Sequence, residues 1–396
     1  MSIGVYTLKS PIARPEMLEF GEFIKAIEKH LGDVFEPVDL DVFTSLDFGL
    51  VYVATGGSEG DFLKDYEALT SKPVCILAGN ESNSLAASME ILSYLKVDGK
   101  SGEILHGDPA QIAERISLLS KVVKGMKKMR GMKAGLVGEP SDWLIASRYD
   151  TEAIEKKLGM ELVEIGMEEF LSEISKADYA PNEWTDKLLH SKYDKAEIEK
   201  ALYVYGALRR LADKYRLGAM TVRCFDLLTT VKTTGCLGVA VLNAEGLYAG
   251  CEGDVPSMLS MCILGAVAGK PAFMCNPSRI DLRRGEMVFA HCTLPVNMPY
   301  DMHLATHYES DLGVAIAGKI PEGDCTVFKV SGDLLRYFAT AGKVKRNLCE
   351  STLCRTQIMV ELPDYSYFLK NPINNHHLVC VGDESATVKA FFDLLP

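Results

Sequence analysis

The sequence Tyr-Ala-Gly-Cys-Glu-Gly-Asp-Val-Pro, residues 248–256, places two carboxylates, Glu252 and Asp254, after a short apolar run that predicts a buried strand. The next segment, 257–268, is uncharged and rich in Met, Leu, Ile and Ala, which predicts a core helix. Its first turn tolerates Pro256, and Asp254 is suited to cap it. Because loops and helix N-termini converge at the carboxyl ends of strands in an α/β sheet, this junction is a candidate binding site. The alternative is structural, with Asp254 only a cap and Glu252 only a solvated edge residue.

Strand and helix patterns alternate through two sets upstream of this junction. Near-continuous apolar runs predict strands buried on both faces, and apolar residues at helical spacing predict the helices between them. The first set has predicted strands at 3–7, 48–54 and 73–78, and predicted helices at 17–31, 85–95 and 109–129. The second set has predicted strands at 133–137, 161–165 and 219–224, and predicted helices at 150–158, 167–176 and 195–215, with a connection at 179–192. This alternation indicates doubly wound α/β domains.

After residue 225 helical periodicity fades, and runs containing Val, Gly and Pro dominate. They predict antiparallel strands beside the single helix of the opening stretch. A chain of 396 residues also exceeds the roughly 250 to 300 residues at which single cores stop growing. We therefore expect an α/β protein with two doubly wound N-terminal domains, 1–130 and 131–224, followed by a strand-rich α+β catalytic domain, 225–396.

Composition and charge exclude several classes of protein. The net charge is -12, with 42 basic against 54 acidic residues, which argues against a nucleic-acid partner. The longest apolar segment, 255–267, is shorter than the about 20 residues that span a bilayer, and no secretion signal is visible. The eleven cysteines lie singly in apolar settings, which is typical of reduced thiols. We expect a cytoplasmic protein with no membrane partner.

Five of the eight histidines fall in the C-terminal part, at 291, 303, 307, 376 and 377. Carboxylate oxygens with one imidazole suit Mn²⁺ or Mg²⁺, whereas a set of thiolates would favour zinc. A lone histidine at a strand end is more often a satisfied polar residue than a ligand. If His376 and His377 lie on a strand, they face opposite sides, so at most one points at a metal ion.

Several motifs occur in an order that resembles the L-fucose isomerase-like proteins, relatives of the L-fucose and L-arabinose isomerases. In this sequence they are Gly250-Cys-Glu-Gly-Asp-Val-Pro-Ser-Met-Leu-Ser-Met, Val288-Phe-Ala-His-Cys-Thr-Leu-Pro, Gly313-Val-Ala-Ile-Ala-Gly, Cys354-Arg-Thr-Gln-Ile and Asn371-Pro-Ile-Asn-Asn-His-His-Leu. Thr55-Gly-Gly-Ser-Glu and Asn83-Ser-Leu-Ala-Ala-Ser-Met-Glu resemble the first domain of the same group. The resemblance implies a Mn²⁺-dependent aldose-ketose isomerase acting on a small sugar, assembled as a homo-oligomeric trimer or hexamer.

The resemblance also implies roles for individual residues. Glu252 and Asp254 match the acidic metal segment, and either His376 or His377 matches the C-terminal metal histidine. A further acid that the family uses upstream has no counterpart in 229–240, so Asp226 is the nearest substitute.

The expected reaction passes through a cis-enediol. Glu252 and Asp254 would act as metal ligands that also move protons, and Asp226 would be a second acid or base. Arg355 and His291 would orient sugar hydroxyls, although a structural role for these two is equally open.

Two other functions remain open. The N-terminal α/β units resemble in outline the lobes of sugar-binding receptors, so a non-catalytic sugar-binding or sensor protein is the main alternative. A nucleotide-binding enzyme would need residues 55–60 as a phosphate loop. Their sequence, Thr-Gly-Gly-Ser-Glu-Gly, lacks the spacing of a dinucleotide fingerprint and the lysine of a P-loop, and a strand-to-helix turn explains the glycines better.

Overall fold

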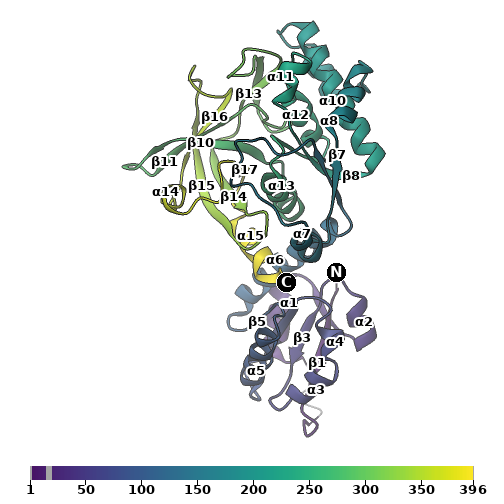
Figure 1. Ribbon diagram of the computed structural model, residues 1–396. Coiled ribbons are helices and arrows are strands. Elements are labelled where there is room, and N and C mark those ends of the chain that lie inside the picture. Colours follow the sequence, from purple (N-terminus) through teal and green to yellow (C-terminus); the bar gives the residue numbers. More distant parts are fainter. Residues whose placement is uncertain (1, 15–19, 396) are drawn as a thin grey trace. The chain divides into compact units, whose positions relative to one another are not determined.

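The computed structural model describes residues 2–14 and 20–395 and forms two compact units (Figure 1). One unit is Met1–Lys127 with Thr387–Pro396, and the other is Lys128–Ala386. The first part of the predicted helix 17–31 lies outside the described residues, and the helix that is described there begins at Glu22.

The first unit contains a five-stranded parallel sheet in the order β2-β1-β3-β4-β5. The order reverses direction beside β1, as in an open doubly wound sheet. Its strands are β1 (Ser2–Leu8), β2 (Val34–Pro37), β3 (Leu50–Val53), β4 (Val74–Ala78) and β5 (Gly102–Leu105). Its helices are α1 (Glu22–Leu31), α2 (Leu40–Ser45), α3 (Glu59–Lys64), α4 (Tyr66–Leu69), α5 (Ser84–Val97), α6 (Pro109–Met129) and, from Thr387 onward, α15 (Ser385–Leu394). Gly57 has φ 76° in the turn between β3 and α3, which accounts for a glycine in the sequence 55–60.

The second unit begins with a four-stranded parallel sheet in the order β7-β6-β8-β9. Its strands are β6 (Lys133–Val137), β7 (Glu161–Ile165), β8 (Leu217–Val222) and β9 (Tyr248–Cys251). The helices of this part are α7 (Thr151–Leu158), α8 (Met167–Ser175), α9 (Glu183–Leu189), α10 (Lys195–Tyr215), α11 (Asp226–Thr230), α12 (Cys236–Ala244) and α13 (Val255–Ala268). The sheet includes β9, which lies beyond the expected boundary at residue 224. The division into three domains stays a prediction.

The rest of the second unit is rich in antiparallel strands, as predicted. Six of them close into a barrel in the order β10-β11-β16-β15-β14-β17. The barrel strands are β10 (Phe273–Asp281), β11 (Glu286–His291), β14 (Gly323–Val330), β15 (Tyr337–Asn347), β16 (Thr356–Glu361) and β17 (His377–Val381). A separate hairpin joins β12 (Asp301–Ala305) to β13 (Ala315–Lys319), and the short helix α14 (Tyr367–Lys370) precedes β17.

Helix α13 lies between the parallel sheet and the barrel (Figure 1). It contacts β8 and β9 on one side and β14 and β17 on the other. Every residue from Val255 to Val267 is buried, which explains why this segment has no polar face. The predicted core helix is confirmed, and its N-terminus lies where the sheet and the barrel meet.

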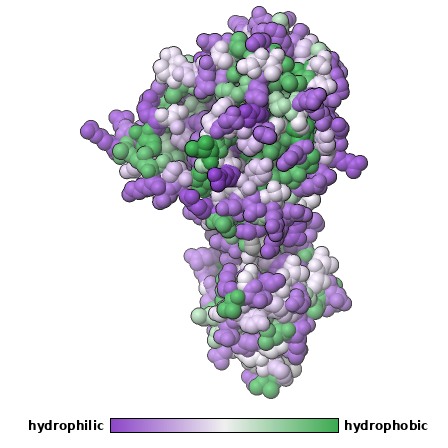
Figure 2. Space-filling view, viewed as in Figure 1, coloured by the Kyte–Doolittle hydropathy of each residue, from purple (hydrophilic) through white to green (hydrophobic). Residues whose placement is uncertain are grey.

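The visible surface is largely polar, with apolar residues in small patches (Figure 2). Among the helices of the described residues, none combines the length and the apolar composition that crossing a bilayer requires. All eleven cysteines are free, as expected, and nine of them are buried. The cytoplasmic location stays a prediction.

Candidate metal centre

The turn between β9 and α13 holds Glu252 in an unusual backbone conformation. Glu252 has φ 65° and Gly253 has φ 68°, and the left-handed region is costly for a residue other than glycine. The Glu252 carbonyl accepts a hydrogen bond from Ser141 N at 2.9 Å, and Gly253 N donates to Val222 O at 3.1 Å. A Cβ on Gly253 would lie 2.7 Å from Pro140 Cα, so only glycine fits there. The surrounding backbone therefore fixes the direction of the Glu252 side chain.

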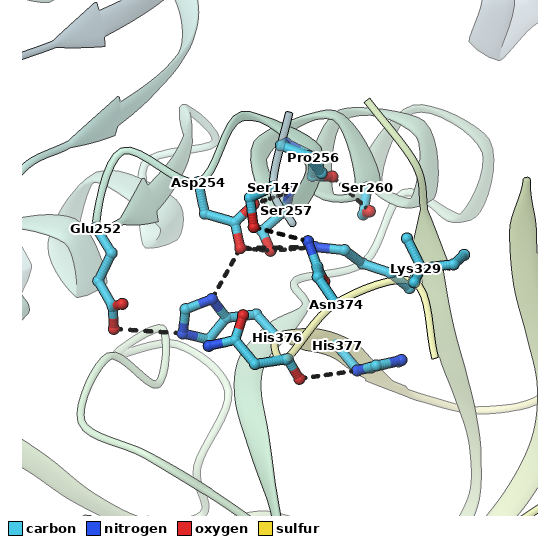
Figure 3. A network of polar contacts seen from close by, with 12 residues as sticks. Ser147, Glu252, Asp254, Pro256, Ser257, Ser260, Lys329, Asn374, His376 and His377 are labelled. Atoms are coloured by element: carbon cyan, nitrogen blue, oxygen red, sulfur yellow. Dashed lines mark hydrogen bonds and ion pairs between the residues drawn. The ribbon is translucent and has the colours of Figure 1, made fainter. Parts of the chain in front are cut away.

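Asp254 is completely buried and caps α13, as predicted. Its Oδ1 accepts from Ser257 N at 2.9 Å. Its Oδ2 accepts from Ser257 Oγ at 2.7 Å and lies 2.8 Å from Nδ1 of His376 (Figure 3). Asp254 therefore lies behind His376 and holds the imidazole from its Nδ1 side.

Three buried side chains converge to form a candidate metal site. They are Glu252, His291 at the end of β11, and His376 immediately before β17. Glu252 Oε1 lies 3.3 Å from His376 Nε2 and 3.8 Å from His291 Nε2, and one ligand atom from each residue lies within 4.8 Å of the others. Each ligand is also held from outside the group. Trp143 Nε1 donates to Glu252 Oε2 at 2.6 Å, and His291 Nδ1 lies 2.7 Å from Thr293 Oγ1.

The residues present fit a divalent metal ion. Nε2 of His376 is buried and lies 3.3 Å from Glu252 Oε1, but it makes no well-aligned hydrogen bond with any described residue. A buried polar atom without a hydrogen bond destabilises the fold unless a ligand binds it. One carboxylate and two imidazoles favour a first-row transition ion over Mg²⁺ or Ca²⁺, which prefer oxygen ligands. The hydrogen bonds on the Nδ1 sides are the outer partners that metal-binding histidines usually have.

The charges of the group stabilise one another. Burial raises the pKa of Glu252, but His291 and His376 outweigh it and hold this pKa below its ordinary value. Burial also raises the pKa of Asp254, but Lys329 and His376 outweigh it and hold this pKa below its ordinary value. Burial lowers the pKa of His376, but the neighbouring carboxylates of Asp254 and Glu252 raise it to about 9. A proton therefore occupies His376 between the carboxylates at neutral pH when no metal ion is bound.

His377 points away from the group (Figure 3). Its Nδ1 lies 3.0 Å from Asn375 O, and its Nε2 lies 3.1 Å from the Tyr367 hydroxyl. Burial lowers the pKa of His377 to about 3, so the ring is neutral. The two adjacent histidines thus face opposite sides, as expected, and His376 faces Glu252.

A pocket opens beside the candidate metal site. Glu252 and His291 contribute to its wall together with His307, whose Nδ1 lies 3.1 Å from Ser310 Oγ. Other residues that line the pocket are Cys224, Phe225, Leu228, Thr234, Cys236, Cys251, Asn276, Cys292, Glu309 and Cys354. A polar end beside a wall of thiols and apolar side chains suits a small polar ligand.

Two of the predicted site residues lie elsewhere. Asp226 accepts from Arg223 Nε at 3.1 Å and lines a different pocket. Arg355 Nε donates to Thr306 O at 2.6 Å, and its guanidinium lies 3.5 Å from Asp311, so it braces the loop that carries His307.

Trp143 and Lys329 are not among the residues that the sequence predicts for the site, and His291, which it predicts to orient sugar hydroxyls, lies in the candidate metal group. Lys329 offered a signal, because a lysine inside the apolar run of β14 is rarely buried without a partner.

The chain is similar to sugar isomerases over most of its length. A scan against protein-family models finds no match. A sulfoquinovose isomerase of Alkalicoccus urumqiensis is 22% identical over 332 residues, which cover 77% of this chain and 71% of that protein. A sulfoquinovose isomerase of Priestia megaterium is 21% identical over 336 residues, which cover 79% of this chain and 75% of that protein. A sulfoquinovose isomerase of Clostridium sp. (strain MSTE9) is 34% identical over 77 residues, which cover 19% of this chain and 17% of that protein. The more specific resemblance to L-fucose isomerase-like proteins stays a prediction.

Proposed function

We propose that this chain catalyses the interconversion of an aldose and a ketose with a divalent metal ion held by Glu252, His291 and His376. The convergence of three buried ligand atoms beside a pocket, with no well-aligned hydrogen bond to Nε2 of His376, carries this proposal. The similarity to sulfoquinovose isomerases supports a sugar as substrate and makes a sulfonated hexose the first to test. Mn²⁺ is the first candidate ion, because the resemblance to the L-fucose isomerase-like proteins implies it and the site includes a carboxylate, which Mn²⁺ accepts as a ligand.

The chemistry that a divalent ion supplies in such a reaction is stabilisation of negative charge on two neighbouring sugar oxygens. Glu252 presents Oε1 toward the imidazoles while Trp143 holds Oε2, so its direction is set before substrate binds. His307 lines the same pocket. We infer that Glu252 and His307 are the groups that move the proton between C1 and C2 through a cis-enediol.

Proton transfer by Asp254 or Asp226, and sugar contacts by Arg355, stay predictions. Both Asp254 oxygens accept hydrogen bonds from protein groups, and Asp226 pairs with Arg223 at 3.1 Å. Homo-oligomerisation as a trimer or hexamer is likewise a prediction, which native mass spectrometry would test.

The test is a substrate panel assayed on chelator-treated protein with Mn²⁺ added back. The panel contains sulfoquinovose, unmodified hexoses and pentoses, and their ketoses. We expect chelation to abolish activity and Mn²⁺ to restore it. Glu252→Gln and His376→Gln should lose both bound metal and turnover, because each removes a ligand, whereas His377→Gln should keep its metal content.

Two results would contradict the proposal. A fully active Glu252→Gln protein would show that this carboxylate is not needed. No interconversion of any sugar by metal-loaded protein would favour the alternative, a non-catalytic sugar-binding or sensor protein.

A further inference from the structure

Lys329 is a charged side chain in the protein core. It lies on β14, its side chain is completely buried, and its ammonium donates to Ser257 Oγ at 2.6 Å (Figure 3). The same nitrogen lies 3.6 Å from Asp254 Oδ2. Removing an ammonium from water costs several kcal/mol unless its partners compensate, so a lysine in this place needs a reason.

The ammonium sets the direction of a chain of hydrogen bonds. An ammonium can only donate, so Ser257 Oγ must accept from Lys329 and turn its own hydrogen toward Asp254 Oδ2, which lies 2.7 Å away. Asp254 Oδ2 is then an acceptor on every side. Nδ1 of His376, 2.8 Å from the same oxygen, must therefore carry a hydrogen.

This direction decides which nitrogen of His376 can bind a metal ion. With the hydrogen on Nδ1, the neutral ring has its lone pair on Nε2, which points toward Glu252 and His291. If Asp254 carried a proton or the serine hydroxyl turned round, the opposite tautomer would put a hydrogen on Nε2 and block the site.

We propose that Lys329 is a positioning residue that acts through Ser257 and Asp254 to present the lone pair of His376 Nε2 to the metal ion. The inference rests on the metal site of the proposed function. Lys329 does not line the pocket, and its ammonium contacts Ser257 and Asp254 on the side of His376. Stability alone does not test this role, because removing one partner of a buried ion pair destabilises the fold whether or not that partner positions His376.

The test compares Mn²⁺ affinity by calorimetry, without substrate, in Lys329→Met and in a matched control. Met keeps the length of the side chain and removes its donors. The control is Ser260→Ala, a buried serine of the same helix whose hydroxyl bonds Pro256 O and Val330 N and does not touch Asp254. We expect Lys329→Met to weaken Mn²⁺ binding by about 10- to 100-fold, the usual effect of losing an outer partner, and Ser260→Ala to change it by less than about twofold.

A double variant separates action through Asp254 from a general structural effect. Asp254→Asn should by itself weaken Mn²⁺ binding about 10- to 100-fold. Adding Lys329→Met to it should then change affinity by less than about twofold, because the path is already broken. If the two losses multiply instead, Lys329 does not act through Asp254 and the inference is wrong. If Lys329→Met alone does not fold, the comparison of Asp254→Asn with the double variant Asp254→Asn/Lys329→Met tests the inference by itself.

The outcomes also separate this inference from the proposed function. A folded Lys329→Met protein with wild-type Mn²⁺ affinity overturns the inference and leaves the proposed function intact. A wild-type protein that binds no divalent ion overturns both. A wild-type protein that binds Mn²⁺ but isomerises no sugar contradicts the proposed function alone, and a selective loss of affinity in Lys329→Met still supports the positioning role.

Discussion

His376 lies between two carboxylates, and this makes the metal-free site a proton-binding site. Asp254 is 2.8 Å from its Nδ1 and Glu252 is 3.3 Å from its Nε2. A metal ion must displace the hydrogen on Nε2, because only the lone pair can bind it. Proton and metal ion therefore compete for one nitrogen. The pH dependence of the unfolding free energy of the metal-free protein should show whether the proton is bound there.

We predict that metal-free protein loses stability as pH rises above about 6.5. The pKa of His376 is raised to about 9 in the folded protein from an unfolded value near 6.5. The stabilisation is therefore fully present below about pH 6.5 and is lost as pH rises through 9. At about 1.4 kcal/mol per pH unit, the loss between about pH 6.5 and 8 is about 2 kcal/mol.

The measurement is urea unfolding of chelator-treated protein, compared with His376→Gln at each pH. Burial lowers the pKa of Lys329 to about 8. Above pH 8 the folded protein loses this proton before the unfolded chain does, which makes stability rise with pH, so the comparison stops at pH 8. The difference in unfolding free energy between the two proteins should shrink from about pH 6.5 to 8. A constant difference would mean that His376 carries no extra proton in the folded state.

At the scale of elements, the contact between α13 and β9 positions Glu252. Gly265 of α13 faces Tyr248 of β9, and a Cβ on this glycine would lie 2.1 Å from Tyr248 Cε1. Alanine normally stabilises a helix interior by about 1 kcal/mol relative to glycine, but here it cannot fit unless the Tyr248 ring is displaced, together with the strand or the helix that it packs between. Such a movement would reach the turn at Glu252, four residues after Tyr248.

We predict that Gly265→Ala destabilises the protein by about 1 to 3 kcal/mol and also weakens Mn²⁺ binding. The matched control is Gly60→Ala in α3, where a Cβ meets nothing within 4 Å and the protein should gain about 0.5 to 1 kcal/mol. Thermal unfolding and calorimetric titration measure the two effects. A Gly265→Ala protein that is more stable than wild type would show that α13 and β9 are not in such close contact.

The elements differ in how well the sequence predicts them. The bounds of α6 and α10 and the end of α13 are predicted as the structure has them, because apolar spacing, a proline or a cap marks these helices. Helix α12 is missed because Cys236–Ala244 is apolar almost all round and so shows no helical period. Helix α9 is missed because it is short and lies in the stretch 179–192, which we expected to be a connection.

The site shows the same limit. Its acidic segment is visible in the sequence because Glu252 and Asp254 are two residues apart. The choice of His376 over His377, and the approach of His291, depend on which face of each barrel strand points inward. For His376 it follows from the pairing of β10 with β17, which joins residues about a hundred positions apart and leaves no local signal.

At the scale of the whole molecule, the chain returns to its first unit. Residues from Thr387 onward join Met1–Lys127, so both ends of the chain belong to one unit. Within it, Phe391 and Leu394 of α15 are completely buried, Ser101 Oγ donates to Leu395 O at 3.0 Å, and Arg115 lies 3.3 Å from Asp393. The first unit therefore lacks part of its core until the last residues of the chain are present.

We predict that Phe391→Ala destabilises the first unit by about 3 to 5 kcal/mol, the usual cost of emptying a buried aromatic site, and leaves Mn²⁺ binding unchanged, because every ligand lies in Lys128–Ala386. Hydrogen exchange should show lost protection in β3 and β4 while β14 and β17 keep theirs. Lys389→Ala, an exposed position of the same helix, is the control and should change neither. If β14 and β17 lose protection together with β3 and β4, the two units unfold as one, and the metal site depends on the last helix of the chain as well as on its own sheet and barrel.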